Sequence, residues 1–458
     1  MDVSLSEMRV GFHGEGAGAG ELTWGQLGIW QAAQLNRRTM NLVWPMRLPR
    51  GVSLAEVTEA LGLVVGRYPA LRTRLQFPDG SRPRQVIAES GEVPLHVADI
   101  GDGDDPDAAA EELRSRYELA YFDYEHEFPI RMGVVRQAGV LSRLVVGVSH
   151  VMLDGGGVNL IFNYLKRLGH SVKPPLSPPG LNPLELARRQ GTPELRRQSE
   201  RAVRYWRTQL DSLPAWQPKE PTRPREPRFN ELVMYSAAME LGMRVVKART
   251  GAGDTAILLA TYSTAVARVL RRNPNAVRLV VSNRFRAELS GMVSQVSQHG
   301  ICVIDTAGAK FDEVVARAHG ATTNASRHAY YDPEACDELI DEITASRGAP
   351  LHVSWCLNDR RVLSRIADRR EVATRERVTE SLRQSKLYWD FEAATSDAPL
   401  IIHVDSDPIP PSRRTLAQGS SLPAAYLIFW TDTHQFERDD MEALAREMER
   451  VAVAAAFD

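Results

Sequence analysis

A histidine and an aspartate four residues apart, His150 and Asp154, have the residue types and spacing best suited to chemistry in this chain. They lie in the run Ser-His-Val-Met-Leu-Asp-Gly at 149–155, after a β-rich apolar segment at 143–148 and before an apolar, helix-like segment at 158–168. An imidazole can take up and release a proton near neutral pH. Loops that follow strands often carry reactive groups, because a rigid scaffold positions them. On their own, these residues fit either a general base at a strand end or a surface turn.

Further motif-like segments surround this run in a fixed order. They are Leu22–Trp30, which contains Gln26; Arg67–Leu75; Tyr205–Leu210 followed by Glu220–Arg225; and Asn283-Arg284 followed by Glu288-Leu289. Together with the H-x-x-x-D-G run, they resemble in type and order the motifs of nonribosomal peptide synthetase condensation domains. Those domains are relatives of the chloramphenicol acetyltransferase-like acyltransferases. The resemblance extends over most of the chain.

The resemblance implies an α/β fold of two chloramphenicol acetyltransferase-like lobes forming a V, with His150 in an active-site tunnel between them. Helix-like and strand-like segments alternate in both halves of the sequence, which also favours two α/β lobes. The implied protein is a free-standing condensation enzyme, an acyltransferase of specialised-metabolite biosynthesis such as antibiotic or nonribosomal peptide synthesis. It would join an acyl or aminoacyl thioester to an amine or a hydroxyl, forming an amide or an ester.

The resemblance also implies where the acyl group comes from. The thioester would arrive on the phosphopantetheine arm of a separate acyl or peptidyl carrier protein, or on CoA, and the acceptor would be a small amine or alcohol. No bound cofactor and no metal are expected. Two alternatives stay open: an O-acyltransferase that uses acyl-CoA or a polyketide carrier, and a non-catalytic relative that recruits carrier proteins.

Roles for individual residues follow from the same resemblance. His150 would assist deprotonation of the nucleophile. Asp154 would form an ion pair with Arg284 from the second lobe, and such a pair can fix one geometry even where its net stabilisation is small. Gly155 would place its backbone N–H near the developing oxyanion, where a preorganised donor has a large effect on the reaction rate.

The chain departs from the family pattern at two places. Ser149 stands where the family usually has the first of two adjacent histidines. After Leu289, polar residues occupy a stretch that is commonly aromatic, and a more polar tunnel floor favours a polar donor or acceptor. The residues expected to line the tunnel are Ser149, Gly156, Gln295, Gln298 and His299.

Composition narrows the class of protein. The 458 residues include 56 basic and 58 acidic side chains, a net charge of −2, which gives no electrostatic footprint for nucleic acid or for an anionic membrane. No apolar run has the length of a membrane-spanning helix. Three widely spaced cysteines suggest neither a disulfide framework nor a zinc site. We therefore expect a cytoplasmic protein with no nucleic-acid or membrane partner.

Glycine-rich and proline-rich stretches, together with helix-capping signals, predict the organisation of the chain. Residues 1–20 are rich in glycine and are predicted to be a disordered leader. Residues 21–180 are predicted to form an N-terminal lobe that contains the H-x-x-x-D-G run, and residues 181–458 a C-terminal lobe. Proline-rich stretches at 173–183 and 214–227 predict connectors. Ser53 and Glu56 have the spacing of a capping box, which predicts a helix from there to about Arg67.

Overall fold

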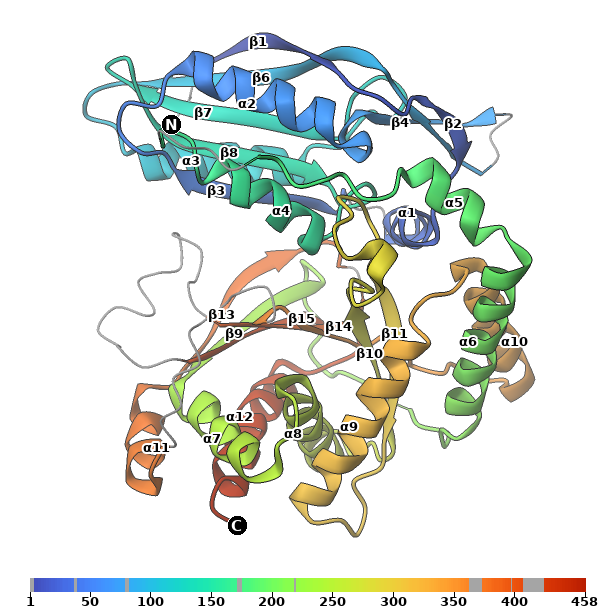
Figure 1. Ribbon diagram of the computed structural model, residues 1–458. Coiled ribbons are helices and arrows are strands. Elements are labelled where there is room, and N and C mark those ends of the chain that lie inside the picture. Colours follow the sequence, from blue (N-terminus) through green and yellow to red (C-terminus); the bar gives the residue numbers. More distant parts are fainter. Residues whose placement is uncertain are drawn as a thin grey trace. The chain divides into compact units, whose positions relative to one another are not determined.

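The computed structural model (Figure 1) describes residues 4–36, 39–78, 82–170, 175–217, 220–361, 373–396, 398–406 and 424–458. By their internal contacts the residues form two units: Met1–Arg197 together with Ser282–Ser297, and Gln198–Val281 together with Gln298–Asp458. The first unit therefore extends past the predicted boundary at residue 180 and also takes a segment from the second half of the sequence. Parts of the two predicted connectors, residues 173–174 and 218–219, lie outside the described residues.

The first unit is built on a five-stranded sheet with the order β1-β6-β7-β8-β3. Its strands are β1 (Ser4–His13), β6 (Ser90–Ile100), β7 (Ile130–Gln137), β8 (Val140–Ser149) and β3 (Asn41–Arg47). A smaller sheet has the order β2-β5-β4, formed by β2 (Gly18–Glu21), β5 (Arg84–Ile87) and β4 (Thr73–Gln76). The helices are α1 (Trp24–Asn36), α2 (Leu54–Arg67), α3 (Pro106–Leu119), α4 (Gly155–Leu165) and α5 (Pro183–Gln190), with a short 3-10 helix, η1, at Pro69–Arg72.

Both faces of the five-stranded sheet are covered, because its central strands are apolar on both sides. Leu144 and Val146 of β8 belong to a core that also contains α2 and α4 side chains, whereas Val145 packs with Leu113 and Tyr117 of α3. Successive side chains of a strand point to opposite faces. The continuous apolar run that precedes His150 is therefore a strand buried between two layers of helix.

Helix α2 confirms the prediction from Ser53 and Glu56. The Ser53 side chain accepts a hydrogen bond from the Glu56 backbone N–H at 3.1 Å, and the helix ends at Arg67. The Glu56 carboxylate accepts from the N–H of Gly169 at 2.8 Å. The helix buries one apolar face, formed by Val57, Ala60, Leu61, Val64 and Val65, so that a local cap and this face together fix the element.

The prediction of a disordered leader is wrong for residues 4–20; residues 1–3 lie outside the described residues. Strand β1 pairs along all ten of its residues with β6 in an antiparallel ladder. The glycine that follows β1 serves close packing: a Cβ at Gly14 would overlap the carbonyl oxygen of Gly66 and lie 2.7 Å from Arg72 Nε. Arg72 is 1% exposed and donates to the carbonyls of Gly66, Ala88 and Glu15.

Burial lowers the pKa of Arg72. Each guanidinium nitrogen donates to a backbone carbonyl, and one of these carbonyls, that of Glu15, belongs to the segment predicted to be disordered. The N-terminal chain is thus held in place by a buried cation that needs its backbone oxygens.

The second unit has a seven-stranded sheet with the order β11-β10-β12-β14-β15-β9-β13. Its strands are β9 (Phe229–Ser236), β10 (Asn275–Val281), β11 (Gln298–Ile304), β12 (Cys356–Asp359), β13 (Lys386–Ala393), β14 (Leu400–Ser406) and β15 (Ala425–Asp432). Its helices are α7 (Ala237–Thr250), α8 (Asp254–Val269), α9 (Phe311–Arg327), α10 (Pro333–Arg347), α11 (Arg375–Ser381) and α12 (Arg438–Ala455), and α6 (Pro193–Asp211) brings the chain in from the first unit.

Helices cover one face of this sheet, and they cover the other face at its β10–β11 end. Side chains of α7, α8, α9 and α12 form one core with the sheet, and α6 and α10 pack on its other face against Ala276 and Ile301. All three cysteines are buried, and burial raises the pKa of the Cys336 thiol to about 12. The thiols are therefore small core groups and not nucleophiles.

The packing of the N-terminal segment gives a matched pair of variants. We expect Gly14→Ala to lower the free energy of unfolding by about 1–3 kcal/mol, the usual cost of overpacking. Gly11→Ala should be close to neutral, because a Cβ at Gly11 has nothing within 4 Å. Chemical denaturation of both variants measures the difference. Equal stabilities would mean that the N-terminal segment does not pack on Gly66 and Arg72.

Candidate active site

The loop after β8 is fixed at its first residue. Ser149, the last residue of the strand, accepts backbone hydrogen bonds on its carbonyl from Met152 and Leu153 at 3.1 and 3.2 Å. The N–H of His150 donates to the carbonyl of Met40 at 3.1 Å. The sequence predicted a strand that opens into a loop here, and the structure shows a tight turn whose backbone leaves His150 little freedom.

The ring of His150 is oriented by a carbonyl of its own loop. Its Nδ1 lies 2.8 Å from the carbonyl oxygen of Leu153. A carbonyl oxygen can only accept, so Nδ1 carries the proton in this hydrogen bond and Nε2 of the neutral ring is the basic nitrogen. The half-buried side chain thus presents one defined atom that can take a proton from a bound group.

Asp154 anchors the other end of the loop and is 2% exposed. Its Oδ1 accepts from the N–H of Gly157 at 2.9 Å, which makes it the N-cap of α4. Its Oδ2 accepts from Arg284 Nη1 at 2.7 Å and from the N–H groups of Val296 and Ser297 at 3.1 and 3.0 Å. Both oxygens of this buried carboxylate are therefore paired, as a buried charge requires.

The predicted ion pair between Asp154 and Arg284 is present, but Arg284 does not come from the second unit as the resemblance implied. It lies in the segment Ser282–Ser297, which the contacts assign to the first unit. Arg284 Nη2 also donates to the carbonyls of Met292 and Ser294 at 2.9 and 3.3 Å. One guanidinium thus closes the segment on itself and ties it to the loop of His150.

Two small residues make this arrangement possible. Asn283 has a φ of 57°, a left-handed conformation that asparagine tolerates better than most residues. A Cβ at Gly156 would lie 2.7 Å from Arg284 Cζ, so only glycine lets the guanidinium approach the first turn of α4. The glycines after Asp154 therefore serve close packing as well as any chemistry.

The first turn of α4 has amide donors that the helix cannot use. The first N–H groups of a helix have no intrahelical acceptor. Asp154 accepts from the N–H of Gly157, and the N–H groups of Gly155 and Gly156, for which the described residues show no acceptor, lie at the positive end of the helix dipole. Gly155, the first residue of α4, directly follows the loop that carries His150. These donors suit a negatively charged oxygen.

A family model described as Condensation domain matches residues 18–349. The chain belongs to the condensation-domain family. Among curated proteins, phosphinothricin tripeptide synthetase PhsC of Streptomyces viridochromogenes is 24% identical over 75% of this chain and 33% of its own length. Surfactin synthase subunit 3 of Bacillus subtilis is 23% identical over 67% of this chain and 25% of its own length. The chain thus spans a third or less of these relatives.

Solved structures support the same fold. The X-domain from teicoplanin biosynthesis has a TM-score of 0.68 at 19% identity, covering 96% of this chain and 95% of that one. The condensation domain from the Monacolin K polyketide synthase MokA has a TM-score of 0.72 at 14% identity, covering 97% and 99%. The two units of this condensation domain are therefore chloramphenicol acetyltransferase-like lobes.

The five residues expected to line the tunnel have different surroundings. Ser149 is buried with its hydroxyl 2.6 Å from that of Tyr124, and Gly156 faces the Arg284 guanidinium. Gln295 is buried, and its Nε2 donates to the carbonyl and hydroxyl of Ser297 at 2.9 and 3.1 Å. For these three residues the structure shows packing and hydrogen-bonding roles in the first unit.

The other two candidates lie on β11 in the second unit. Gln298 Nε2 donates to the carbonyl of Tyr331 at 2.7 Å, and the Tyr331 hydroxyl donates to the carbonyl of His299 at 2.9 Å. Among the described residues, Oε1 of Gln298 and of Gln295 is buried and has no hydrogen-bond partner. The expectation that these residues form a tunnel floor stays a prediction.

The opening motif of the condensation domain, Leu22–Trp30, contacts the loop of His150 through Gln26. Thr23 and Gln26 cap α1 reciprocally: the N–H of Thr23 donates to Gln26 Oε1 at 2.8 Å, and the N–H of Gln26 donates to Thr23 Oγ1 at 3.3 Å. Gln26 Nε2 reaches Gln85 and lies 3.5 Å from Met152 Sδ. The motif thus acts through packing on the loop, a role that its sequence alone did not reveal.

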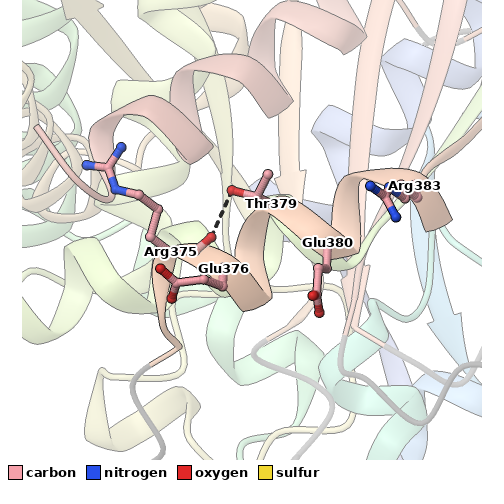
Figure 2. Close-up of a pocket in the computed structure, with 5 residues that line it drawn as sticks. All are labelled: Arg375, Glu376, Thr379, Glu380 and Arg383. Atoms are coloured by element: carbon pink, nitrogen blue, oxygen red, sulfur yellow. Dashed lines mark hydrogen bonds between the residues drawn. The ribbon is translucent and has the colours of Figure 1, made fainter.

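A surface hollow on the second unit is a different kind of site. It has a volume of about 330 Å³ and is lined by Arg375, Glu376, Thr379, Glu380 and Arg383. Figure 2 shows these side chains along α11 and the turn that follows it, with the Thr379 hydroxyl donating to the carbonyl of Arg375. Charges of both signs alternate on an exposed helix, which is typical of a solvated surface. No group there matches the chemistry of His150.

Within the described part of the chain, no group of three or more His, Cys, Asp or Glu side chains could hold a metal ion. The expected absence of a metal stays a prediction. No helix in the same residues is long and apolar enough to cross a membrane.

The Asp154–Arg284 pair can be tested by a double-mutant cycle. We expect Asp154→Asn to destabilise the protein by about 3–5 kcal/mol, because an amide would turn a donor toward the donors that now meet the carboxylate. Arg284→Ala should also destabilise, and the double variant should lose less than the sum of the single losses. Denaturant unfolding measures all three variants. Additive losses would contradict a direct interaction.

Proposed function

We propose that this condensation domain is an acyltransferase that joins a thioester-bound acyl or aminoacyl group to an amine or a hydroxyl. The observation that carries this proposal is the fixed orientation of His150: Nδ1 is held by the Leu153 carbonyl and Nε2 is left as the basic atom. This orientation leaves one defined nitrogen to take a proton from a bound nucleophile. The loop that carries His150 runs directly into α4, whose first N–H groups, those of Gly155 and Gly156, have no acceptor within the helix.

The proposed reaction needs three operations from the protein. His150 Nε2 takes the proton from the nucleophile as its nitrogen or oxygen attacks the thioester carbonyl carbon. The N–H of Gly155 donates to the oxyanion of the tetrahedral intermediate. When the intermediate collapses, the C–S bond breaks, and the imidazolium returns the proton to the departing thiolate. An amide or ester and a free thiol are the products.

Asp154 and Arg284 have a supporting role in this proposal. Neither oxygen of Asp154 is available as a base, since each accepts hydrogen bonds from the protein. The pair instead holds the loop and the first turn of α4 at a fixed separation. Small displacements of a catalytic group have large effects on rate, so this support has a catalytic consequence without direct contact with substrate.

We further propose the source of the acyl group. It arrives on the phosphopantetheine arm of an acyl or peptidyl carrier protein, or on CoA, and the thioester supplies the activation, so that the chain needs no cofactor of its own. The relatives that support this proposal include peptide synthetases by name, phosphinothricin tripeptide synthetase PhsC and the nonribosomal peptide synthetase kk1B of Curvularia clavata. One solved relative is described as acting in condensation domain-mediated chain release from the enacyloxin polyketide synthase.

A second candidate function has one specific observation in its favour. A structurally similar X-domain has been solved in complex with another protein, OxyB, from teicoplanin biosynthesis, with a TM-score of 0.67. This chain could likewise recruit a partner enzyme or a carrier protein. Recruitment by itself does not require Nε2 of His150, so a variant at this residue separates the two functions.

The decisive variant is His150→Ala. We expect turnover to fall by about two to four orders of magnitude, the range for loss of a positioned general base, with the melting temperature nearly unchanged. The exposed His170 gives a matched control, and His170→Ala should retain full turnover. Mass spectrometry of products from loaded carrier proteins or acyl-CoA with amines and alcohols measures the rate and identifies the bond formed. Wild-type turnover in His150→Ala would contradict the general-base role of His150, whereas no turnover by the wild-type protein with any donor and acceptor would leave recruitment as the better proposal.

A further inference from the structure

The residue before His150 has a partner that the motif did not reveal. The Tyr124 hydroxyl lies 2.6 Å from the Ser149 hydroxyl, a short hydrogen bond in which either oxygen can donate. Ser149 has no exposed surface, and its Oγ also accepts from the N–H of Val151 at 3.2 Å. The Ser149 side chain thus links a tyrosine outside the loop to the backbone inside it.

Tyr124 is itself held on several sides. Its ring meets that of Trp30 edge to face, with centroids 5.6 Å apart and an interplanar angle of 82°. Trp30 packs in turn on Phe77, at 5.4 Å between centroids. The Tyr124 carbonyl accepts from the N–H of Leu75 at 2.7 Å. Burial raises the pKa of Tyr124, so the phenol stays protonated and can take part in the hydrogen bond at any ordinary pH.

A continuous set of bonds runs from Tyr124 to the His150 ring. Tyr124 holds the Ser149 side chain, the Ser149 carbonyl holds the N–H of Leu153, and the Leu153 carbonyl holds His150 Nδ1. Each step is a hydrogen bond between groups of one unit. A shift of Ser149 would therefore move the acceptor that selects the protonated nitrogen of His150.

We infer that Tyr124 and Ser149 form a positioning pair that fixes the tautomer and orientation of His150. Neither residue is placed at the reacting atoms. The pair acts through the Leu153 carbonyl, and Trp30 of the opening motif supports it from the other side. Its importance for catalysis rests on the proposed function, whereas its effect on the ring of His150 does not.

The first test observes the ring directly. In protein labelled with ¹⁵N-histidine, the signals of His150 can be assigned by their loss in His150→Gln. We expect the wild-type neutral ring to be protonated at Nδ1, and Tyr124→Phe and Ser149→Ala each to shift it toward a mixture of tautomers. Ser149→Thr keeps a hydroxyl and should restore the wild-type signals. Tyr121→Phe removes the hydroxyl of an exposed tyrosine three residues away and should change nothing.

The second test measures the reaction. Tyr124→Phe and Ser149→Ala should each lower kcat by about tenfold with little change in KM, and the double variant should resemble the single ones. Ser149→Thr should recover most of the rate.

The two tests distinguish a failure of the positioning pair from a failure of the proposed function. Unchanged His150 signals in folded Tyr124→Phe and Ser149→Ala would overturn the positioning pair, whatever the activity. If the wild-type protein transfers no acyl group but its His150 signals respond as expected, the pair stands and the proposed function fails.

Discussion

The buried carboxylate of Asp154 is the group on which the site depends. A charge that is 2% exposed must be paired on both oxygens or it destabilises the fold by several kcal/mol. Here the partners are an amide of α4, the Arg284 guanidinium and two amides of the segment Ser282–Ser297. To satisfy one carboxylate, the start of a helix and a segment 130 residues away in sequence must both come to the loop of His150.

This requirement explains why structural and chemical roles coincide in the motif. The loop from His150 to Asp154 has its first end on β8 and its second end at the cap of α4, so its backbone has little freedom. A carbonyl inside the loop then selects which nitrogen of His150 is basic. The glycines that follow allow Arg284 to approach and leave amide donors open at the helix start. Each feature first satisfies the fold, and the same groups are those that the proposed proton transfer and oxyanion binding require.

Family membership and activity rest on different grounds here. The match over residues 18–349 shows the condensation-domain family, and structural neighbours below 20% identity show its fold. A fold supports many functions, and activity must be argued from the site. In this protein, the geometry of His150, Asp154 and the first turn of α4 supports the proposed activity. The near-neutral charge of the chain adds no preference for a polyanionic partner.

The sequence by itself determined the elements whose signals are local. The cap and apolar face of α2 and the strand that leads to His150 were predictable in this way, whereas the pairing of Asp154 with Arg284 was implied by the resemblance to the family. Tertiary structure decided what depends on distant partners. Strand β1 forms because β6 offers a ten-residue ladder, although its surroundings are rich in glycine. Segment Ser282–Ser297 belongs to the first unit because Asp154 needs its donors. Tyr124 meets Ser149 across 25 residues with no pattern that connects them. Periodicity and spacing report on residues that are close in sequence. A buried hydrogen bond, in contrast, forms between groups that the fold buries next to each other, and these groups can be far apart in sequence.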